Sequence, residues 1–414
     1  MKIVADFHIH SKYSRAVSKE MTLENLDVWA KKKGIHVMGT GDFTHPQWFK
    51  EISTKLEPAE SDLYRLKGSS SPTRFMLTVE ISSIYKKRDK ARRIHNLIFA
   101  PSIEAVQKIN DALSLRGNLR SDGRPILGVD SKDILKIALD ANPRSVLIPA
   151  HAWTPWFSIF GSMSGFDAIE ECFDEMSKYI FAIETGLSSD PAMNWRLSKL
   201  DNISLISNSD SHSLERIGRE SNVFDTDLSY DAIIDAMKSK DPKKFLNTIE
   251  FFPEEGKYHF DGHRACNFSQ DPHITKEKGK ICPKCKRPMT IGVLYRVEEL
   301  ADRPPGASSP RAIPYKSLVT LDKIIGDALD VGEKSKSVKK EYEVLINKFG
   351  NELAVLLDVS EADLKSAVDA KIAEGIVRVR EGKIKVVPGY DGEYGKISIF
   401  NNSEGAAVPQ NTLF

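Results

Sequence analysis

The sequence predicts an α/β protein whose first 245 residues form a barrel of about seven strand–helix units. Short apolar runs alternate there with segments that repeat apolar residues at helical spacing, such as Leu23–Lys32 and Ile103–Leu115. This alternation is typical of a parallel sheet covered by helices. We expect strands at Lys2–Phe7, Val37–Gly41, Phe75–Ile81, Ile94–Ala100, Ser145–Ala150, Phe181–Glu184 and Ile203–Ser207.

Two smaller regions should follow the barrel, since 414 residues exceed one ordinary core. Residues 246–310 are rich in His, Cys, Gly and charge and end in the connector-like ADRPPGASSPR, which predicts a small metal-binding module. Residues 311–399 should form helices over Tyr315–Gly350 and Asn351–Gly375, the second with a capping signal at Ser360. From residue 376 apolar and polar residues alternate, which predicts a β-hairpin, and residues 400–414 are expected to be a flexible tail.

Composition limits the possible partners of the chain. The 59 basic and 58 acidic residues give a net charge of +1, so any attraction to nucleic acid must be local. Three of the four cysteines fall between Cys266 and Cys285, which favours a metal knuckle in a reducing cytoplasm over a disulfide scaffold. The sequence contains neither a signal peptide nor about 20 consecutive apolar residues, so we expect a soluble protein without a membrane partner.

Histidines and carboxylates gather at the ends of the predicted strands. His8 and His10 close the first strand, and residues two apart on a strand point to the same face, so both imidazoles can hold one ion. Asp210 and His212 repeat that spacing after the last apolar run. Strand ends meet at one rim of a (β/α) barrel, which would bring these pairs together with the other candidates: Asp42, His45, Glu80, His95 and His151.

This mixture of ligands favours Zn, Mn or Fe, and a carboxylate such as Glu80 can bridge two ions. For a single residue such as His95 or His151, a structural role in the core is the alternative. The recurrence of the pattern at successive strand ends favours a cluster of ions.

These motifs carry a resemblance to the PHP (polymerase and histidinol phosphatase) superfamily, which has an opening H-x-H and a late D-x-H, here FHIHSKYS and NSDSHS. Within that superfamily, GHRAC, CPKC, TIGVLYRVEELADRP and PGYDGEYGKI resemble endonuclease Q of the archaeal type over nearly the whole chain. The resemblance implies a distorted seven-stranded barrel and a DNA repair endonuclease that cuts 5′ of deaminated bases (uracil, hypoxanthine, xanthine) or abasic sites. Its site would hold two or three divalent ions, Zn or possibly Mn or Mg.

Two segments depart from the commoner PHP pattern. Many relatives place an Asp or His ligand where this chain has Ser14, Arg15 and Ala16, and the usual T-D-H motif is replaced by Gly41-Asp42-Phe43-Thr44-His45. It is therefore open whether Asp42, His45 or both reach an ion. The expected chemistry is attack by ion-activated water, with Glu80, Asp210 and His212 as the candidate catalytic groups.

A second metal site is predicted from two Cys/His pairs. His263-Arg264-Ala265-Cys266 and Cys282-Pro283-Lys284-Cys285 have the spacing of a tetrahedral structural zinc site. Cys266, Cys282 and Cys285 are three expected ligands, and the fourth is His263, with His259 and His273 as rivals.

A nuclease also needs phosphate contacts, and two basic clusters could provide them. The candidates are Lys86, Lys87, Arg88, Lys90, Arg92 and Arg93 in the first cluster, and Arg378, Arg380, Lys383 and Lys385 in the second. Trp153 and Trp156, after His151, form a possible wedge or stacking platform for an unstacked base, and Tyr390 is a weaker candidate. The alternatives are solvated charged faces for the clusters and local packing for the aromatic residues.

The last five residues, Gln410-Asn411-Thr412-Leu413-Phe414, resemble the start of the peptide that docks into sliding clamps (PCNA), but the motif is cut short. An ordinary tail is the alternative. Two other functions are the alternatives: a small-molecule phosphomonoesterase of the histidinol phosphatase type, and an inactive binding module. A repair nuclease would work on damaged DNA in the cytoplasm, at the nucleoid.

Overall fold

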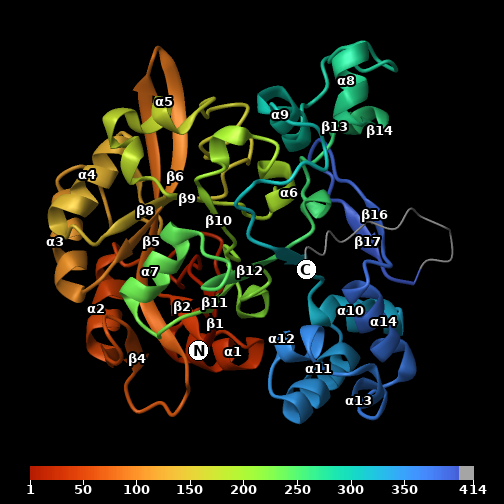
Figure 1. The fold of residues 1–414 in the computed structure, drawn as a ribbon, viewed down its shortest axis with the longest axis horizontal. Coiled ribbons are helices and arrows are strands. Elements are labelled where there is room, and N and C mark those ends of the chain that lie inside the picture. The colour runs from red at the N-terminus through yellow and green to blue at the C-terminus, as the bar shows by residue number, and fades with distance from the viewer. Residues whose placement is uncertain (401–414) are drawn as a thin grey trace.

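One mixed sheet organises the N-terminal part of the computed structural model, which describes residues 1–400. At its centre β1 (Lys2–Asp6) pairs in parallel with β2 (Val37–Gly39) and antiparallel with β11 (Ser221–Asp225). The sheet continues through β5 on one side and through β12 and β15 on the other; these strands span Arg74–Lys87, Phe245–Glu250 and Tyr315–Ser317. The C-termini of β1 and its parallel neighbours therefore point to the same edge (Figure 1).

All seven predicted strands exist, but they do not all run in parallel. β5 and β6 (Lys90–Ala100) form a long antiparallel hairpin, and β6 is antiparallel to β8 (Val146–Pro149). β9 (Ala182–Glu184) and β10 (Ser204–Ile206) form a separate parallel pair. The expectation of a uniformly parallel sheet is wrong here, because Arg88 and Asp89 form a tight turn that returns the chain beside β5. Within residues 1–400, strand hydrogen bonds do not join all seven strands into one ring.

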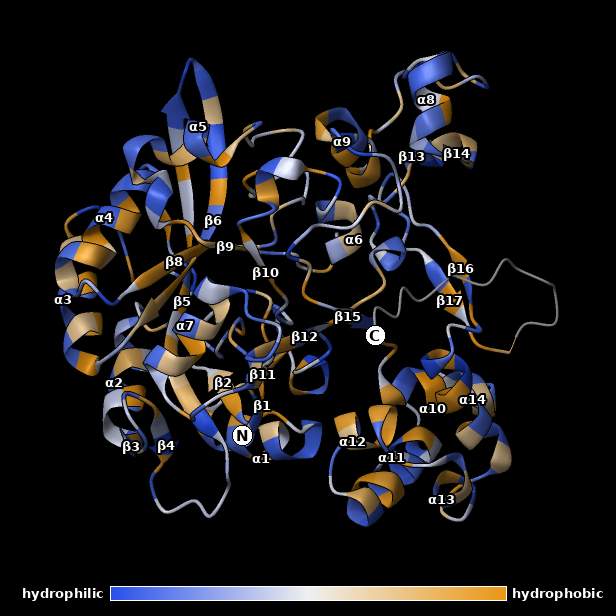
Figure 2. Ribbon diagram, in the orientation of Figure 1, coloured by the Kyte–Doolittle hydropathy of each residue, from blue (hydrophilic) through white to orange (hydrophobic). Residues whose placement is uncertain are grey.

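Helices cover this sheet, and their ends follow local capping rules. α1 (Leu23–Lys33) begins where the Thr22 hydroxyl accepts a hydrogen bond from the Asn25 N–H, and it ends at Gly34, whose φ of 89° suits glycine. α3 (Ile103–Ser114) and α4 (Ser131–Ala141) have side-chain caps of the same kind. Their apolar faces turn toward the sheet (Figure 2). The remaining elements are α2 (Pro46–Lys55), β3 (Leu56–Pro58), β4 (Tyr64–Leu66), β7 (Ile126–Leu127), α5 (Ile169–Phe173), α6 (Pro191–Asn194) and α7 (Tyr230–Ser239).

The expected second region begins later than predicted. A boundary at residue 245 cuts into β12, which runs to Glu250 as a member of the main sheet, and β15 returns to that sheet after the connector. Between them lies a small outlying segment with little sheet of its own (Figure 1). Its elements are β13 (Asp261–His263), β14 (Phe268–Gln270), α8 (Pro272–Lys278) and α9 (Val293–Leu300).

The C-terminal part is a group of short helices followed by a hairpin. The helices are α10 (Leu321–Leu329), α11 (Lys336–Phe349), α12 (Glu352–Leu357), α13 (Glu361–Lys365) and α14 (Ala370–Arg380), and the hairpin is β16 (Lys385–Val387) with β17 (Lys396–Ser398). The Ser360 cap is confirmed, since its hydroxyl accepts from the Asp363 N–H.

Two expectations for this part were wrong. Residues 315–317 are a strand, and residues 376–380 belong to α14 instead of a hairpin. Ile372, Ile376 and Val379 are buried three or four residues apart, so the helical period decides the structure.

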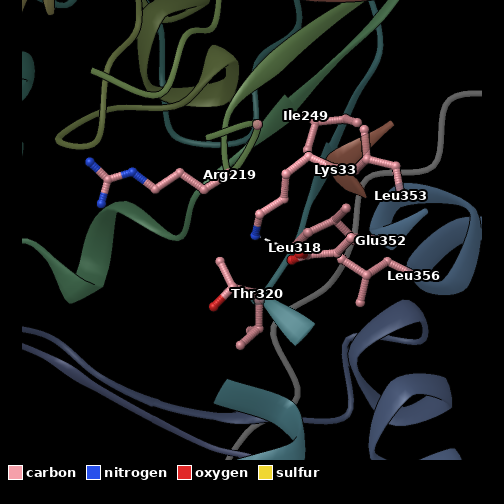
Figure 3. A pocket seen from close by; sticks show the side chains of 10 residues that line it. Lys33, Arg219, Ile249, Leu318, Thr320, Glu352, Leu353 and Leu356 are labelled. Atoms are coloured by element: carbon pink, nitrogen blue, oxygen red, sulfur yellow. Dashed lines mark hydrogen bonds and ion pairs between the residues drawn. The ribbon is translucent and has the colours of Figure 1, made fainter. Parts of the chain in front are cut away.

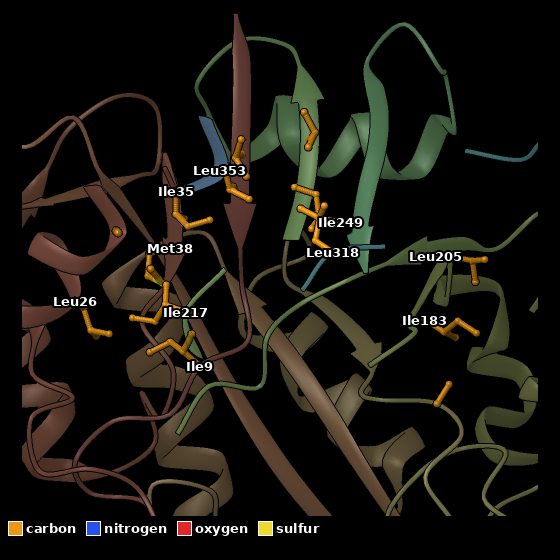
Figure 4. Packing of buried hydrophobic residues seen from close by; sticks show 14 of the residues in the cluster. Ile9, Leu26, Ile35, Met38, Ile183, Leu205, Ile217, Ile249, Leu318 and Leu353 are labelled. Carbon is orange, nitrogen blue, oxygen red and sulfur yellow. The ribbon is translucent and has the colours of Figure 1, made fainter. Parts of the chain in front are cut away.

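A buried ion pair joins the two parts. Lys33 at the end of α1 donates to Glu352 of α12 over 2.5 Å (Figure 3). Glu352 also accepts from Tyr342 and from the Leu321 N–H. Apolar side chains from both parts pack beside it, including Ile249, Leu318 and Leu353 (Figure 4). Among residues 1–400, each helix is too short or too polar to cross a bilayer.

Candidate metal centre

Two groups of potential metal ligands share one carboxylate, Glu80. His8, His10, Glu80 and Asp210 form the first group, and Glu80, His95 and His151 form the second; within each group the ligand atoms lie within 4.8 Å of one another. The candidates come from four distant stretches of chain, and most are buried.

Strand geometry explains why these side chains meet. His8 and His10 follow β1 and Asp210 follows β10, and these segments are joined by a bridge between Ile9 and Ser211. His151 follows β8. Across the β5–β6 hairpin Ser82 pairs with His95, so Glu80 lies two residues along the same face of β5 and reaches that imidazole diagonally.

The two oxygens of Glu80 face different groups. Oε1 lies 2.6 Å from His95 Nδ1 and 2.9 Å from His151 Nε2, and Oε2 lies 3.3 Å from His10 Nε2 and 3.6 Å from His8 Nε2. The Nε2 atom of His8 is buried and has no hydrogen-bond partner among residues 1–400. A buried polar atom without a partner is costly, and a divalent ion between these nitrogens and oxygens would satisfy it. The donor set therefore fits divalent ions.

Two further carboxylates orient the first pair of histidines. Glu184 accepts from His8 Nδ1, at 3.0 Å from both of its oxygens, and Asp42 accepts from His10 Nδ1 over 3.0 Å. The Nδ1 proton is thereby fixed, so each Nε2 lone pair turns toward the first ligand group.

The expectation that Asp42 is a ligand is not supported by this geometry. Its Oδ2 accepts from the Ser11 N–H, the Ser11 hydroxyl and the Ser14 hydroxyl, and its Oδ1 accepts from His10. Asp42 belongs to neither ligand group, because both oxygens are already occupied in holding His10 and the following loop. Ser14, at the position where many PHP relatives place a ligand, is part of this support.

His45 is also outside both ligand groups. It precedes α2, and its ring stacks on Tyr13 with 4.5 Å between the ring centroids. His212 lies closer: its ring centroid is 4.7 Å from that of His10, and its Nδ1 donates to the Asp210 carbonyl oxygen over 2.9 Å. Its side chain is 34% exposed, which places it at the opening of the site and not in either group.

Burial and neighbouring charges shift the pKa values of the buried histidines and of Glu80. Burial alone would lower the pKa of His8 and His10, but Glu184 and Glu80 around His8, and Asp42 and Asp210 around His10, raise both well above the ordinary value. The pKa of Glu80 is held well below its usual range by His95, Arg124 and His8 despite burial. For His95 burial dominates and lowers the pKa to about 4. Binding of a divalent ion at the first group would displace a proton from each of the His8 and His10 imidazoles, because a nitrogen that ligates a metal carries no proton.

Several of these residues have an uncommon backbone conformation. Asp42, His151 and Asp210 have φ values of 49°, 28° and 45°. Non-glycine residues rarely adopt positive φ, and such conformations concentrate at functional sites. Gly186 touches the same region, since a Cβ atom there would lie 2.5 Å from His151 Cβ.

Two residues of the site were missed by the sequence analysis. Glu184 ends a predicted strand as Glu80 does, so the same signal could have found it. Arg124, whose Nη1 lies 3.1 Å from Glu80 Oε2, follows a loop with no strand pattern, and nothing in the sequence indicated it.

Comparisons with known proteins agree with this geometry. Residues 320–383 match the family model described as the MJ0043 C-terminal domain. The uncharacterized protein YqxK of Bacillus subtilis is 32% identical, over 96% of this chain and 99% of its own length. The uncharacterized protein MJ0043 of Methanocaldococcus jannaschii is 34% identical over 60% of this chain, but the match covers only 31% of that protein.

The solved structures are more informative. The lesion-specific endonuclease PfuEndoQ from Pyrococcus furiosus superposes with a TM-score of 0.84 and 31% identity, covering 96% of this chain and 95% of the enzyme. This chain belongs to the endonuclease Q family. A second structure, of endonuclease Q in complex with a 27-mer duplex substrate that carries an abasic lesion at the active site, superposes with a TM-score of 0.82 and 31% identity, covering 96% of both chains.

The predicted zinc ligands of this endonuclease Q family member lie together. One ligand atom each from His263, Cys266, Cys282 and Cys285 falls within 4.8 Å of the others, and Cys285 Sγ is 3.4 Å from His263 Nδ1. The rivals lie elsewhere: His259 is buried against Phe260, and His273 is near Glu298. The arrangement favours His263 as the fourth ligand.

Several predicted DNA contacts are used inside the protein instead. Trp153 is fully buried, and its indole N–H donates to Asn194. Arg92 is buried against Phe166 and donates to the Gly165 carbonyl. Lys87 donates to the Cys172 carbonyl and to Asp174. The expectation of DNA contact was wrong for these three residues, because each side chain forms its hydrogen bonds inside the protein.

The C-terminal arginines have internal roles as well. Arg380 donates to the carbonyls of Val355, Leu356 and Val359 at the end of α12, and Arg378 donates to the Ile399 carbonyl and lies over Phe400. Both therefore hold elements together, and their contact with DNA stays a prediction. Arg88 pairs with Glu171 at the hairpin tip, whereas Arg93 lies over Phe157, whose ring contacts His95. The Arg88 side chain is 58% exposed and Trp156 is 37% exposed, so Arg88, Arg93 and Trp156 remain candidates for DNA contact.

Proposed function

We propose that this chain is a DNA repair endonuclease that hydrolyses the phosphodiester 5′ of a deaminated base (uracil, hypoxanthine or xanthine) or an abasic site. The observation that carries the proposal is Glu80 shared by two ligand groups, in a chain similar over 96% of its length to lesion-specific endonucleases. Two ligand groups support at least two divalent ions. Zn, Mn and Mg are the candidates.

The ligand residues would hold the ions, which when bound supply a nucleophilic water at neutral pH and a counter-charge for the phosphate. Glu80 would connect the two ion positions, and Glu184 and Asp42 would keep His8 and His10 in the correct tautomer. The distorted seven-stranded PHP barrel of the resemblance is a proposal of the same kind.

His212 is suited to proton transfer at the opening. The Asp210 carbonyl can only accept, so His212 Nδ1 carries the proton and Nε2 is left with a free lone pair. Burial lowers its pKa, so the ring is neutral at pH 7. We propose that His212 accepts a proton from the attacking water, with Asp210 beside it.

An exposed aromatic row extends from the site toward the zinc-binding segment. The ring of Trp156 meets that of Tyr258 edge-on at 5.8 Å, and the Lys257 ammonium lies 5.7 Å from Tyr258 and 5.6 Å from Tyr394. Tyr394 is 71% exposed. Rings with an interleaved cation suit stacking with bases near a backbone, so we propose that this row receives nucleotides beside the lesion.

The zinc-binding segment supports that row. A structural Zn²⁺ on His263, Cys266, Cys282 and Cys285 would stabilise a segment that lacks a large core. Tyr390, once a candidate stacking residue, donates to Asn267 next to Cys266, and Gly389 lies against Gly256 beside Lys257. We propose that zinc positions the aromatic row indirectly.

Other partners and functions are less supported. The phosphomonoesterase alternative needs only the N-terminal part, whereas the similarity continues through the C-terminal helices. The clamp-binding motif at residues 410–414 lies outside the described residues and stays a prediction, as does location at the nucleoid.

The direct test is cleavage of labelled duplexes that contain uracil, hypoxanthine, xanthine, an abasic site or no lesion. Cutting 5′ of the lesion that is lost with EDTA and in Asp210→Asn supports the proposal. Equal cutting of undamaged DNA would refute lesion specificity, and hydrolysis of an aryl phosphate without DNA cleavage would favour the phosphatase.

A further inference from the structure

Arg124 is the one guanidinium that contacts the shared carboxylate of the metal centre among residues 1–400. We propose that Arg124 binds the phosphate undergoing hydrolysis by donating N–H groups to its non-bridging oxygens. This inference rests on the proposed function, because it assigns the substrate phosphate to a place in the same site.

The main chain on either side of Arg124 is held firmly. Asp122 accepts from the Arg124 N–H over 3.1 Å, and the Gly123 N–H donates to the Tyr13 carbonyl over 3.1 Å. On the other side the Pro125 carbonyl accepts from the Ser82 N–H, and β7 pairs with β5 immediately afterwards. A Cβ at Gly123 would lie 2.3 Å from Asp42 Oδ2, so the loop passes directly against the support of His10. These hydrogen bonds and the β5–β7 pairing fix the loop that carries Arg124 beside the metal centre.

Most of the hydrogen-bonding capacity of the guanidinium is unused. Its single hydrogen bond to a residue in the range 1–400 runs from Nη1 to Glu80 Oε2, over 3.1 Å. A guanidinium has five N–H donors and no lone pair for a metal ion. Arg124 therefore cannot be a ligand, and it retains donors in the fork geometry that matches phosphate oxygens.

The side chain also lies where a substrate would arrive. His8, His10, Glu80, His95 and His151 are at most 10% exposed, whereas Asp210, Arg124 and His212 are 25%, 27% and 34% exposed. These three side chains are the more exposed ones around the ligand groups, so a phosphate that enters from solvent would meet them before the more deeply buried ligands.

Charge balance favours phosphate binding over a purely structural role. The four imidazoles that face Glu80 would be neutral as metal ligands. Two divalent ions would be balanced by the four carboxylates of Glu80, Asp210, Glu184 and Asp42, so Arg124 would add the positive charge that is left over. A further cation is stable there only beside an anion, and the charge on a phosphate grows as water attacks it.

The rival explanation is that Arg124 only positions Glu80. The two roles predict different losses when Arg124 is substituted. A positioning role predicts that Arg124→Ala loses bound ion, whereas a phosphate-binding role predicts unchanged ion content and weaker anion binding.

The test compares metal-loaded wild-type protein with Arg124→Ala and Arg124→Lys. Arg65→Ala is the matched control, since Arg65 forms an Arg–Glu pair with Glu57 on the β3–β4 hairpin. Ion content is measured by mass spectrometry, inorganic phosphate binding by calorimetry, and kcat and KM on an abasic duplex. We expect Arg124→Ala to keep its ions, to bind phosphate roughly 10-fold or more weakly, and to lose about 10²–10³ in kcat. Arg124→Lys should recover part of both losses, and Arg65→Ala should change neither.

Loss of ions from Arg124→Ala, or phosphate affinity within twofold of wild type, would overturn the proposal. The phosphate measurement does not depend on lesion cleavage. If wild-type protein cuts none of the lesion duplexes, the proposed function fails while the anion-binding result still decides the role of Arg124.

Discussion

Glu80 and His95 lie diagonally across the β5–β6 hairpin, with 2.6 Å between the carboxylate oxygen and the imidazole nitrogen. The antiparallel register of β5 and β6 sets this contact. Because Glu80 belongs to both ligand groups, its side chain links the second group to the first. The metal centre thus depends on a strand pairing that a uniformly parallel sheet would not contain.

Glu184 should be needed for ion binding although it belongs to neither ligand group. It accepts from His8 Nδ1, the His151 N–H and Asn208. Replacing it with Gln leaves the shape but weakens the hold on His8, so we expect Glu184→Gln to lower ion affinity and cleavage about 10–100-fold. Titration of ion-free protein with Zn²⁺ measures this. An unchanged affinity would show that His8 is oriented by packing alone.

Trp156 and Trp153 should respond differently to substitution although only two residues separate them. Trp156→Ala removes an exposed ring beside Tyr258, so binding of a lesion duplex should weaken by about 1–3 kcal/mol with little change in melting temperature. Trp153→Phe removes a buried hydrogen bond to Asn194 and should lower the melting temperature with little effect on binding. Fluorescence anisotropy and thermal melting of both variants distinguish the roles. Equal DNA affinity of Trp156→Ala and wild type would remove Trp156 from the proposed surface.

The zinc prediction concerns Cys282. Cys282→Ser should lose one equivalent of tightly bound zinc and lower the melting temperature, because metal binding contributes folding free energy in segments with little core. Cys172, buried beside Tyr85 outside the group, provides the control: Cys172→Ser should keep its zinc whatever its stability. Retention of full zinc content by Cys282→Ser would contradict the assignment.

A buried acid away from the metal centre predicts how stability depends on pH. Burial raises the pKa of Glu250 from 4.5 to about 8, although Thr248 and Thr185 donate hydrogen bonds to it. The unfolded state therefore releases its proton at lower pH than the native state. From Glu250, the free energy of unfolding should fall by at most about 1.4 kcal/mol per pH unit as pH rises from 4.5 to 8, and then level off.

Glu250→Gln should flatten this slope and be relatively more stable than wild type near pH 8. Urea unfolding at several pH values measures the effect. An unchanged slope in the variant would assign the pH dependence to other groups, such as the neighbouring Glu220, whose pKa burial also raises.

Sequence reasoning found most of the site because strand ends are marked by local patterns. His8, His10, Glu80, His95, His151 and Asp210 all follow or lie in apolar runs, and the structure brings them together. Sequence reasoning could not separate a ligand from the carboxylate that orients a ligand, so the role of Asp42 was left open. That distinction depends on which atoms Ser11 and Ser14 reach. Arg124 was beyond prediction because its loop is placed by contacts with Tyr13 and Ser82, which are distant in sequence.

The positions of the helices and strands were easier to predict than the directions in which the strands run. The spacing of apolar residues located seven strands of the N-terminal part but missed β3, β4, β7, β11 and β12. Nothing local in the sequence indicates whether the next strand returns through a two-residue turn, as at Arg88 and Asp89. The residues Ile376 to Arg380 in α14 fit both the two-residue repeat of a strand and the 3.6-residue repeat of a helix. Packing of α14 against α10 stabilises the helix.

The most direct test of the account is anomalous X-ray scattering from crystals of the zinc-loaded protein. We expect at least two ion peaks that both lie within bonding distance of Glu80, one reached by His8, His10 and Asp210 and the other by His95 and His151. Peaks at the Cys282 site alone, or active-site ions that Glu80 does not touch, would contradict the central claim that one carboxylate joins two ion positions.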